Sequence, residues 1–221
     1  MTERKLVRLV GDIHGMFYDY EVHSLGRGIR HSTDHVPAHS VQVGDFGIGF
    51  NSPYWHDQVN SWMIDNPTHR FIRGNHDNPE LCKTMAGYIP DGTVEKDVMY
   101  VGGAWSIDHA WRTPGVSWWP DEELSYEELD KLVTKFGQVK PRVMITHDCP
   151  TSVAHKMFIS NGLGLSSSII KTRTGEAFQA MFELHQPEHW IHGHWHHTRT
   201  ADINGTKFQC LGELDFIDME I

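Results

Sequence analysis

The chain lacks the features that mark secreted and membrane-spanning proteins. Its three cysteines, Cys82, Cys149 and Cys210, lie far apart and form no CxxC pair, which fits a reducing compartment better than a disulfide framework. No apolar run approaches the length that spans a bilayer. The first residues contain neither a long apolar stretch nor a small-residue cleavage site of the kind found in secretory signals. We therefore expect a cytoplasmic protein with no membrane partner.

Basic residues are also scarce. Lysine and arginine number 19 against 29 aspartates and glutamates, which gives a formal net charge of −10. This balance argues against extensive nucleic-acid binding, but it is compatible with a small anionic substrate, because bound cations can reverse a local field. No internal repeat or low-complexity tract is present, and 221 residues with 39% hydrophobic content suit one domain, over residues 1–221, with a sizeable core.

Histidine, in contrast, is abundant. There are 17 in the chain, and four of them crowd into "WIHGHWHHTR" (190–199): His192, His194, His196 and His197. Histidine is the commonest metal ligand, yet a solvated surface segment could have the same composition. The segment alone does not rank these four side chains, so other motifs must do so.

Apolar and amphipathic stretches alternate along the chain, which is typical of an α/β protein. Strands are expected over residues 5–10, 40–45, 69–77, 97–108, 141–148 and 188–194, and a hairpin over 198–212 that turns at Asn204 and Gly205. Helices are expected over residues 52–66 with Ser52 as the cap, 125–137 with a Ser125–Glu128 capping box and a stop at Gly137, and 175–186. Together these elements predict an α/β fold.

Polar side chains follow the carboxyl ends of five of these strands. They are Asp12, Asp45, Asn75, His147 and His194. In open α/β sheets, binding sites assemble at the carboxyl ends of strands. We therefore expect these five side chains to converge on one site.

Five short motifs carry these residues in a fixed order. They are "GDIHG" (11–15), "GDFG" (44–47), "GNHD" (74–77), "TH" (146–147) and "GHWH" (193–196). With these motifs the chain resembles the calcineurin-like metallophosphoesterases over residues 11–196. The resemblance implies a sandwich of two mixed β-sheets flanked by helices (α/β/β/α).

The resemblance also implies two divalent cations that share a ligand. Asp45 is expected to bridge them, with Asp12, His14 and His196 on one cation and Asn75, His147 and His194 on the other. Mixed imidazole, carboxylate and carbonyl ligands suit Mn²⁺ best, with Fe or Zn²⁺ as alternatives. If "GHWH" is extended, alternation would point His194 and His196 the same way.

His76 has a different expected role. In the resembled family, the histidine of "GNH" is not a metal ligand but lies near the ester oxygen, where it protonates the leaving group or stabilises charge. Such general-acid catalysis is typically worth 10²- to 10⁴-fold. The nucleophile is expected to be a metal-bound hydroxide that attacks in line, and Asn75 is expected to contact the substrate as well.

The chain departs from the protein Ser/Thr phosphatase branch of that family. Ile48 and Gly49 occupy positions where that branch usually has an aspartate and a phosphate-gripping arginine, and Asp77 replaces its common glutamate. We expect hydrolysis of a phosphomonoester, from a small phosphorylated compound or a phosphoprotein. Phosphodiester or nucleotide hydrolysis is the alternative, and a catalytically silent scaffold comes last. The oligomeric state is left open.

Three residues are further candidates for substrate contacts. Arg73 would hold phosphate or form a structural salt bridge, and Arg112 or His109 would contact the substrate. The tryptophans of segment 102–123 would either pack in a lid or core, which we favour, or stack on a substrate ring. Segment 158–169 is either a loop over the site or an inert connector.

Three residues near the expected ligands are assigned lesser roles. Cys149 is expected to be a bystander to the metal site. His192 is expected to pack in the core or to orient a ligand, and His197 to take no part.

Overall fold

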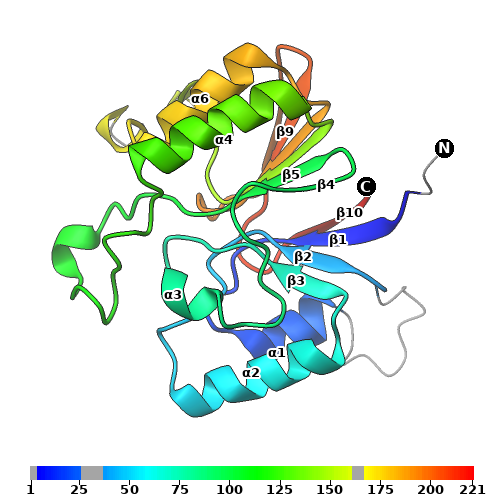
Figure 1. Ribbon diagram of the computed structural model, residues 1–221, viewed down its shortest axis with the longest axis vertical. Coiled ribbons are helices and arrows are strands. Elements are labelled where there is room, and N and C mark those ends of the chain that lie inside the picture. The colour runs from blue at the N-terminus through cyan, green and yellow to red at the C-terminus, as the bar shows by residue number, and fades with distance from the viewer. Residues whose placement is uncertain (1–3, 26–36, 161–166) are drawn as a thin grey trace.

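Two β-sheets stack face to face, with helices on both outer surfaces (Figure 1). This arrangement comes from a computed structural model that describes residues 4–25, 37–160 and 167–221. It confirms the predicted α/β/β/α class.

The first sheet has four strands in the order β10-β1-β2-β3. Their bounds are β1 Leu6–Val10, β2 Ser40–Gln42, β3 His69–Phe71 and β10 Phe216–Glu220. β1, β2 and β3 run parallel, and β10 pairs antiparallel with β1. The carboxyl ends of β1, β2 and β3 therefore share one edge of this sheet.

The second sheet has six strands in the order β4-β5-β6-β7-β9-β8. Their bounds are β4 Thr93–Glu95, β5 Val98–Val101, β6 Val143–Thr146, β7 His189–His192, β8 Arg199–Ile203 and β9 Thr206–Cys210. β5, β6, β7 and β9 run parallel, while β4 and β8 pair antiparallel at the two edges. β8 and β9 form the predicted hairpin, and Asn204 and Gly205 take the positive φ angles that its turn requires.

The helices lie on the outer faces of the sheets. Their bounds are α1 Phe17–Asp19, α2 Pro53–Asp65, α3 Pro79–Cys82, α4 Tyr126–Val139, α5 Thr151–Ala154 and α6 Arg173–Leu184, with short 3₁₀ or π turns at Tyr20–Ser24, His109–Trp111, His155–Ile159 and Ser167–Ile170. α4 and α6 cover the second sheet, and α1 and α2 cover the first (Figure 1). None of the helices in the described part of the chain is long and apolar enough to cross a membrane.

Apolar side chains fill three layers of this stack. Leu9 and Ile145 belong to a buried cluster between the two sheets. Phe136 of α4 and Phe178 of α6 pack on the outer face of the second sheet, and Met63 of α2 packs with the residues on the outer face of the first. The stack holds the two sheets together, so the loops at their carboxyl edges can meet.

Three details differ from the sequence predictions. The strands are shorter than predicted, because each of the five strands before a polar motif residue ends at least one residue ahead of it. The predicted stop at Gly137 is wrong: α4 continues to Val139 and ends where Lys140 takes a left-handed conformation with φ 49°. β4 and β10 were not predicted. Half of the segment 158–169 falls on residues 161–166, outside the described residues.

Candidate metal centre

Loops after five parallel strands, three in one sheet and two in the other, bring the predicted polar residues to one place. Asp12, Asp45 and Asn75 follow β1, β2 and β3, while His147 and His194 follow β6 and β7. The contacts below join residues from all five loops. The predicted convergence at the strand ends is therefore what the structure shows.

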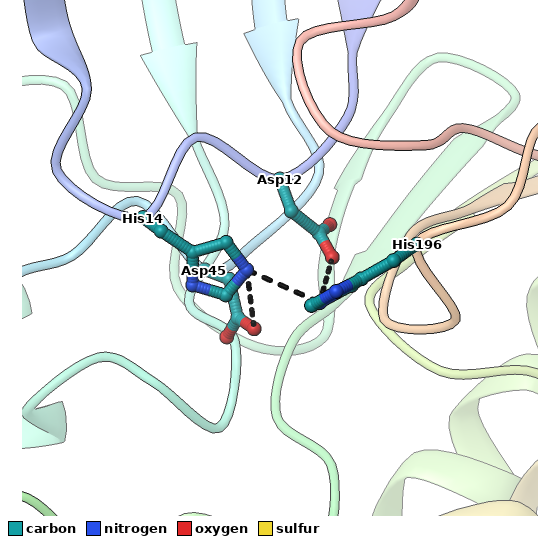
Figure 2. A group of neighbouring side chains, drawn as sticks. All are labelled: Asp12, His14, Asp45 and His196. Atoms are coloured by element: carbon teal, nitrogen blue, oxygen red, sulfur yellow. Dashed lines mark hydrogen bonds and ion pairs between the residues drawn. The ribbon is translucent and has the colours of Figure 1, made fainter.

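One group of four side chains faces a common point (Figure 2). It comprises Asp12, His14, Asp45 and His196, whose ligand atoms all lie within 4.8 Å of one another. His196 Nε2 lies 3.3 Å from Asp12 Oδ2, and His14 Nε2 lies 3.8 Å from Asp45 Oδ2. The two imidazole Nε2 atoms lie 3.1 Å apart. Two carboxylates and two imidazole nitrogens form a donor set that suits a divalent transition-metal ion.

A second group meets on the other side of Asp45. Asn75 Oδ1 lies 3.0 Å from His147 Nε2 and 2.9 Å from His194 Nδ1. His147 Nε2 also lies 3.2 Å from Asp45 Oδ1. Asp45 thus presents one carboxylate oxygen to each group, which is the position expected of a bridging ligand.

The hydrogen-bonding pattern shows that these groups are suited to cations. The Nδ1–H group of His147 donates to the carbonyl oxygen of Val43 at 2.9 Å, so its Nε2 lone pair faces Asn75 Oδ1 and Asp45 Oδ1. Lone pairs facing one another require a proton or a metal ion between them. Asp45 Oδ2 is buried and has no hydrogen-bond partner among the described residues. The residues present therefore fit a two-cation site.

The electrostatics agree with this fit. Burial raises the pKa of Asp12, and the adjacent charge of Asp45 raises it further, to a value well above the usual range. Burial opposes ionisation of His147 as well, yet the carboxylates of Asp45 and Asp12 raise its pKa to about 10. Two carboxylates that are fully buried side by side need positive charge to remain ionised, and divalent cations would provide it.

Four of the site residues have left-handed backbone conformations. The φ angles are 43° at His14, 57° at Asp45, 69° at His194 and 52° at His196. Such conformations cost non-glycine residues free energy and tend to cluster at functional sites. They also correct one expectation. β7 ends at His192, so the "GHWH" histidines reach the site through turns and not through strand alternation.

Two motif glycines allow the close approaches in this centre. A Cβ atom at Gly74 would lie 2.0 Å from Asp45 Oδ1, and one at Gly193 would lie 2.1 Å from Asp12 Oδ1. Neither contact is possible for a real side chain. The motif glycines thus leave room for the Asp45 and Asp12 carboxylates of the two donor groups.

Asp77 holds two of the motif loops together. Its buried carboxylate accepts hydrogen bonds from the backbone N–H groups of Phe46, Gly47, Ile48 and Gly74, at 2.7 to 3.0 Å. The loop that carries Asp45 is therefore joined to the loop that carries Asn75 and His76. From the sequence alone, Asp77 marks only a departure from the phosphatase pattern.

A cavity of about 340 Å³ opens beside the first group. His76, Phe50 and Arg112 line it together with His14, His196 and Glu213. No sequence motif marks Glu213 as a site residue. Nη2 of Arg112 lies 3.4 Å from His76 Nε2. Because a guanidinium only donates, it favours the neutral imidazole with a free Nε2 lone pair. Burial, assisted by Arg112, lowers the pKa of His76 even though Asp45 opposes this.

The other two candidates for substrate contacts lie elsewhere. Arg73 is 2% exposed, and its guanidinium binds Asp91 Oδ2 at 2.8 Å and the carbonyl oxygen of Glu122 at 2.7 Å. The structural salt bridge is therefore the alternative that its contacts match. His109 lines a separate cavity with Trp105 and Trp118, so the predicted contact between His109 and substrate is not supported by its position.

Removal of Arg73 should therefore affect stability and not substrate binding. Arg73→Met leaves the partly buried Asp91 carboxylate without its cation, and we expect the free energy of unfolding to fall by about 1–3 kcal/mol. As a matched control, Arg70→Met removes a surface ion pair with Glu95 and should change it by less than about 1 kcal/mol. Denaturant unfolding of the metal-free protein measures both. An Arg73→Met variant with unchanged stability but a raised KM would restore the substrate-binding role.

The remaining histidines and tryptophans divide as follows. His192 is fully buried and its Nδ1 contacts the carbonyl oxygen of Gly193, while His197 is exposed. Trp195 stacks on Phe158 with ring centroids 4.5 Å apart and donates to Asp148, which anchors the loop between His194 and His196. Trp119 is 6% exposed and its ring packs against Phe50, as the packing alternative predicts, whereas Trp111 is 90% exposed and does not fit that alternative.

Comparisons with known proteins bear on the fold. Sequence comparison finds no matching family model and no matching curated protein. Among solved structures, a Staphylococcus aureus protein assigned as a 5′-nucleotidase, in complex with α-ketoglutarate, matches 96% of this chain and 49% of its own at 14% identity, with a TM-score of 0.53. A phosphopantetheinyl hydrolase of Mycobacterium tuberculosis matches 96% and 91% at 13% identity, with a TM-score of 0.52. The chain has the calcineurin-like metallophosphoesterase fold.

The shared fold does not by itself determine the function. The chain spans about half the length of the Staphylococcus protein. GAP50, the anchor in the inner membrane complex of Plasmodium, also matches, over 94% of this chain and 72% of its own at 11% identity, with a TM-score of 0.50. The fold thus occurs in a protein described as an anchor, so function must be argued from the side chains.

Proposed function

We propose that this protein is a phosphoesterase that uses two divalent cations and prefers phosphomonoesters. The observation that carries the proposal is the pair of donor groups that share the buried Asp45 carboxylate. Its Oδ2 atom has no hydrogen-bond partner in the described part of the chain. The names of two structural neighbours, a 5′-nucleotidase and a phosphopantetheinyl hydrolase, are consistent with action on phosphate esters.

Each cation has its own ligand set in this proposal. One set is Asp12, His14, Asp45 and His196, and the other is Asp45, Asn75, His147 and His194. Mn²⁺ is the first candidate, and Fe or Zn²⁺ would suit the same donors. When bound, two such cations lower the pKa of a shared water and stabilise charge on a phosphoryl group.

Side chains around the cavity supply the rest of the chemistry. His76 would protonate the leaving oxygen as the phosphorus–oxygen ester bond breaks, and water would supply the oxygen that joins phosphorus. The Nε and Nη1 groups of Arg112 are held by Asp108 and by the carbonyl oxygen of Ser117. Its Nη2 group faces His76, where it can bind a phosphoryl oxygen.

The preference for monoesters rests on charge. A phosphomonoester is close to a dianion at neutral pH, and the Arg112 guanidinium adds a positive charge beside the metal positions. A diester carries one charge less and would gain less from this contact. The substrate is accordingly proposed to be a small phosphorylated compound or a phosphoprotein.

The test is a metal titration combined with two aryl substrates. Metal-free protein should hydrolyse neither substrate, and addition of Mn²⁺ should restore hydrolysis of p-nitrophenyl phosphate more than that of bis-p-nitrophenyl phosphate. The reverse preference would establish the phosphodiesterase alternative. Turnover of neither substrate, together with no bound metal, would leave the scaffold alternative.

A further inference from the structure

A serine of the tryptophan-rich segment 102–123 hydrogen-bonds to Asn75 of the second donor group. Ser106 follows Trp105 and is 1% exposed. Its Oγ atom lies 3.0 Å from Nδ2 of Asn75, which is 3% exposed. The Ser106 hydroxyl is therefore the hydrogen-bond partner of the Asn75 amide on the side that faces away from His147 and His194.

A count of protons determines the direction of that hydrogen bond. The Glu122 carboxylate lies 2.8 Å from the backbone nitrogen of Ser106 and 2.5 Å from its Oγ. A carboxylate accepts only, so the single hydroxyl proton of Ser106 is directed to Glu122. Ser106 Oγ must then accept from Asn75, and only the NH₂ group of that amide can donate.

The orientation of Asn75 follows directly. With Nδ2 directed to Ser106, Oδ1 faces His147 Nε2 at 3.0 Å and His194 Nδ1 at 2.9 Å. The opposite amide orientation would turn an NH₂ group, which cannot bind a cation, toward those two nitrogens. The exchange of the two amide atoms would therefore remove a ligand from the second group.

We propose that Ser106 and Glu122 are positioning residues that hold the Asn75 amide with its oxygen toward the second cation. This inference rests on the proposed function. It also explains one contact of Arg73, whose guanidinium binds the carbonyl oxygen of Glu122 and so fixes the backbone of that residue. Glu122 is 3% exposed and hydrogen-bonds to Ser106 through both carboxylate oxygens, so the two side chains fix each other's position.

Calorimetric titration of the metal-free protein with Mn²⁺ tests the proposal without reference to activity. The wild type should bind two ions. Ser106→Ala should keep the affinity of one site and weaken the other about 10- to 100-fold, which is the usual effect of losing a group that orients a metal ligand. Glu122→Gln should weaken the same site to a similar extent. The NH₂ group of the glutamine would face either the backbone N–H or the hydroxyl group of Ser106, and two donors cannot hydrogen-bond to each other.

Two further variants separate positioning from general damage. Ser106→Thr retains the hydroxyl and should keep most of the affinity of the second site. Ser117→Ala removes a serine hydroxyl of the same segment that bonds the Thr113 backbone, and it should bind both ions as the wild type does. Thermal unfolding of each metal-free variant shows whether it is folded, and Glu122→Gln replaces Ser106→Ala if the latter is not.

The outcomes distinguish this inference from the proposed function. Wild-type affinity for two ions in both Ser106→Ala and Glu122→Gln would overturn the positioning role and leave the dinuclear centre intact. A wild-type protein that binds one Mn²⁺ ion or none would overturn the dinuclear centre itself. Equal weakening of both sites in Ser106→Ala would also contradict the inference, because only one site contains Asn75.

Discussion

Replacement of Asp45 by asparagine is expected to remove most of the bound metal and nearly all of the activity. A neutral amide has one oxygen and an NH₂ group, so it cannot present an oxygen to both ligand groups. We expect kcat/KM in Mn²⁺ to fall on the order of 10³-fold or more, since a single preorganised electrostatic contact is already worth about 10²- to 10³-fold. Metal analysis of the purified variant and p-nitrophenyl phosphate kinetics measure the two effects.

The same substitution should also lower the stability of the metal-free protein. Burial opposes ionisation of Asp45, but the charge of His147, with those of His76 and His14, holds the pKa of Asp45 well below its usual range. A carboxylate whose pKa is lowered by folding contributes stability when it is ionised, so the metal-free Asp45→Asn protein should melt below the wild-type temperature at neutral pH. The rise in melting temperature that Mn²⁺ gives the wild type through preferential binding to the native state should disappear.

Asp65→Asn provides the matched control. Asp65 is exposed at the end of α2, so its amide should leave metal content, kinetics and the response to Mn²⁺ unchanged. Full metal content and wild-type kcat/KM in Asp45→Asn would rule out the bridging role of Asp45.

The convergence of five polar residues could be predicted because the information is local, whereas their division into two ligand groups, with His14 and His196, followed from the resemblance to the metallophosphoesterases. Each of the five polar residues stands directly after an apolar run, and the carboxyl ends of parallel strands meet at one edge. The spacing of Asp12, Asp45 and Asn75 thus needed only the strand pattern to place them together. The predicted helices and strands are present for the same reason, although the strands are shorter than the apolar runs from which they were predicted.

The supporting contacts could not be read from the sequence. Glu122 lies 16 residues from Ser106 and 47 from Asn75 along the chain, and nothing in their local pattern marks a hydrogen-bonded chain of three. Glu213 faces His196 from the loop before β10, a strand that was not predicted. Burial of Arg73 depends on Asp91, whose position follows from tertiary packing and not from any motif.

The left-handed turns at the ligands escaped prediction for a related reason. Glycine and asparagine favour positive φ, whereas His194 and His196 adopt it only because the surrounding structure imposes it. Trp195 lies between these two histidines in the chain, and its stacking on Phe158 is one contact that constrains the backbone there. A pattern-based argument therefore predicted extended backbone there, whereas the two imidazoles reach the candidate site through turns.

Replacement of His76 by alanine is expected to keep the metals and to lower the rate in a way that depends on the leaving group. The contact of the His76 backbone N–H with Asp45 Oδ1, at 2.7 Å, survives the substitution, so the metal content should equal that of the wild type. Loss of a general acid typically costs 10²- to 10⁴-fold. We expect the larger loss with alkyl phosphates, whose leaving oxygen needs the proton, and the smaller loss with p-nitrophenyl phosphate.

The pH dependence adds a second signature. Burial lowers the pKa of His76 in the free protein, and a general acid acts in its protonated form, so kcat/KM should fall as pH rises through a pKa below the usual range of histidine. Bound phosphate brings negative charge beside the imidazole and should move the corresponding fall in kcat to higher pH. Both transitions should be absent in His76→Ala and present in His197→Ala, a control at an exposed histidine. Equal losses for all leaving groups, with both transitions retained, would show that His76 stabilises charge without donating a proton.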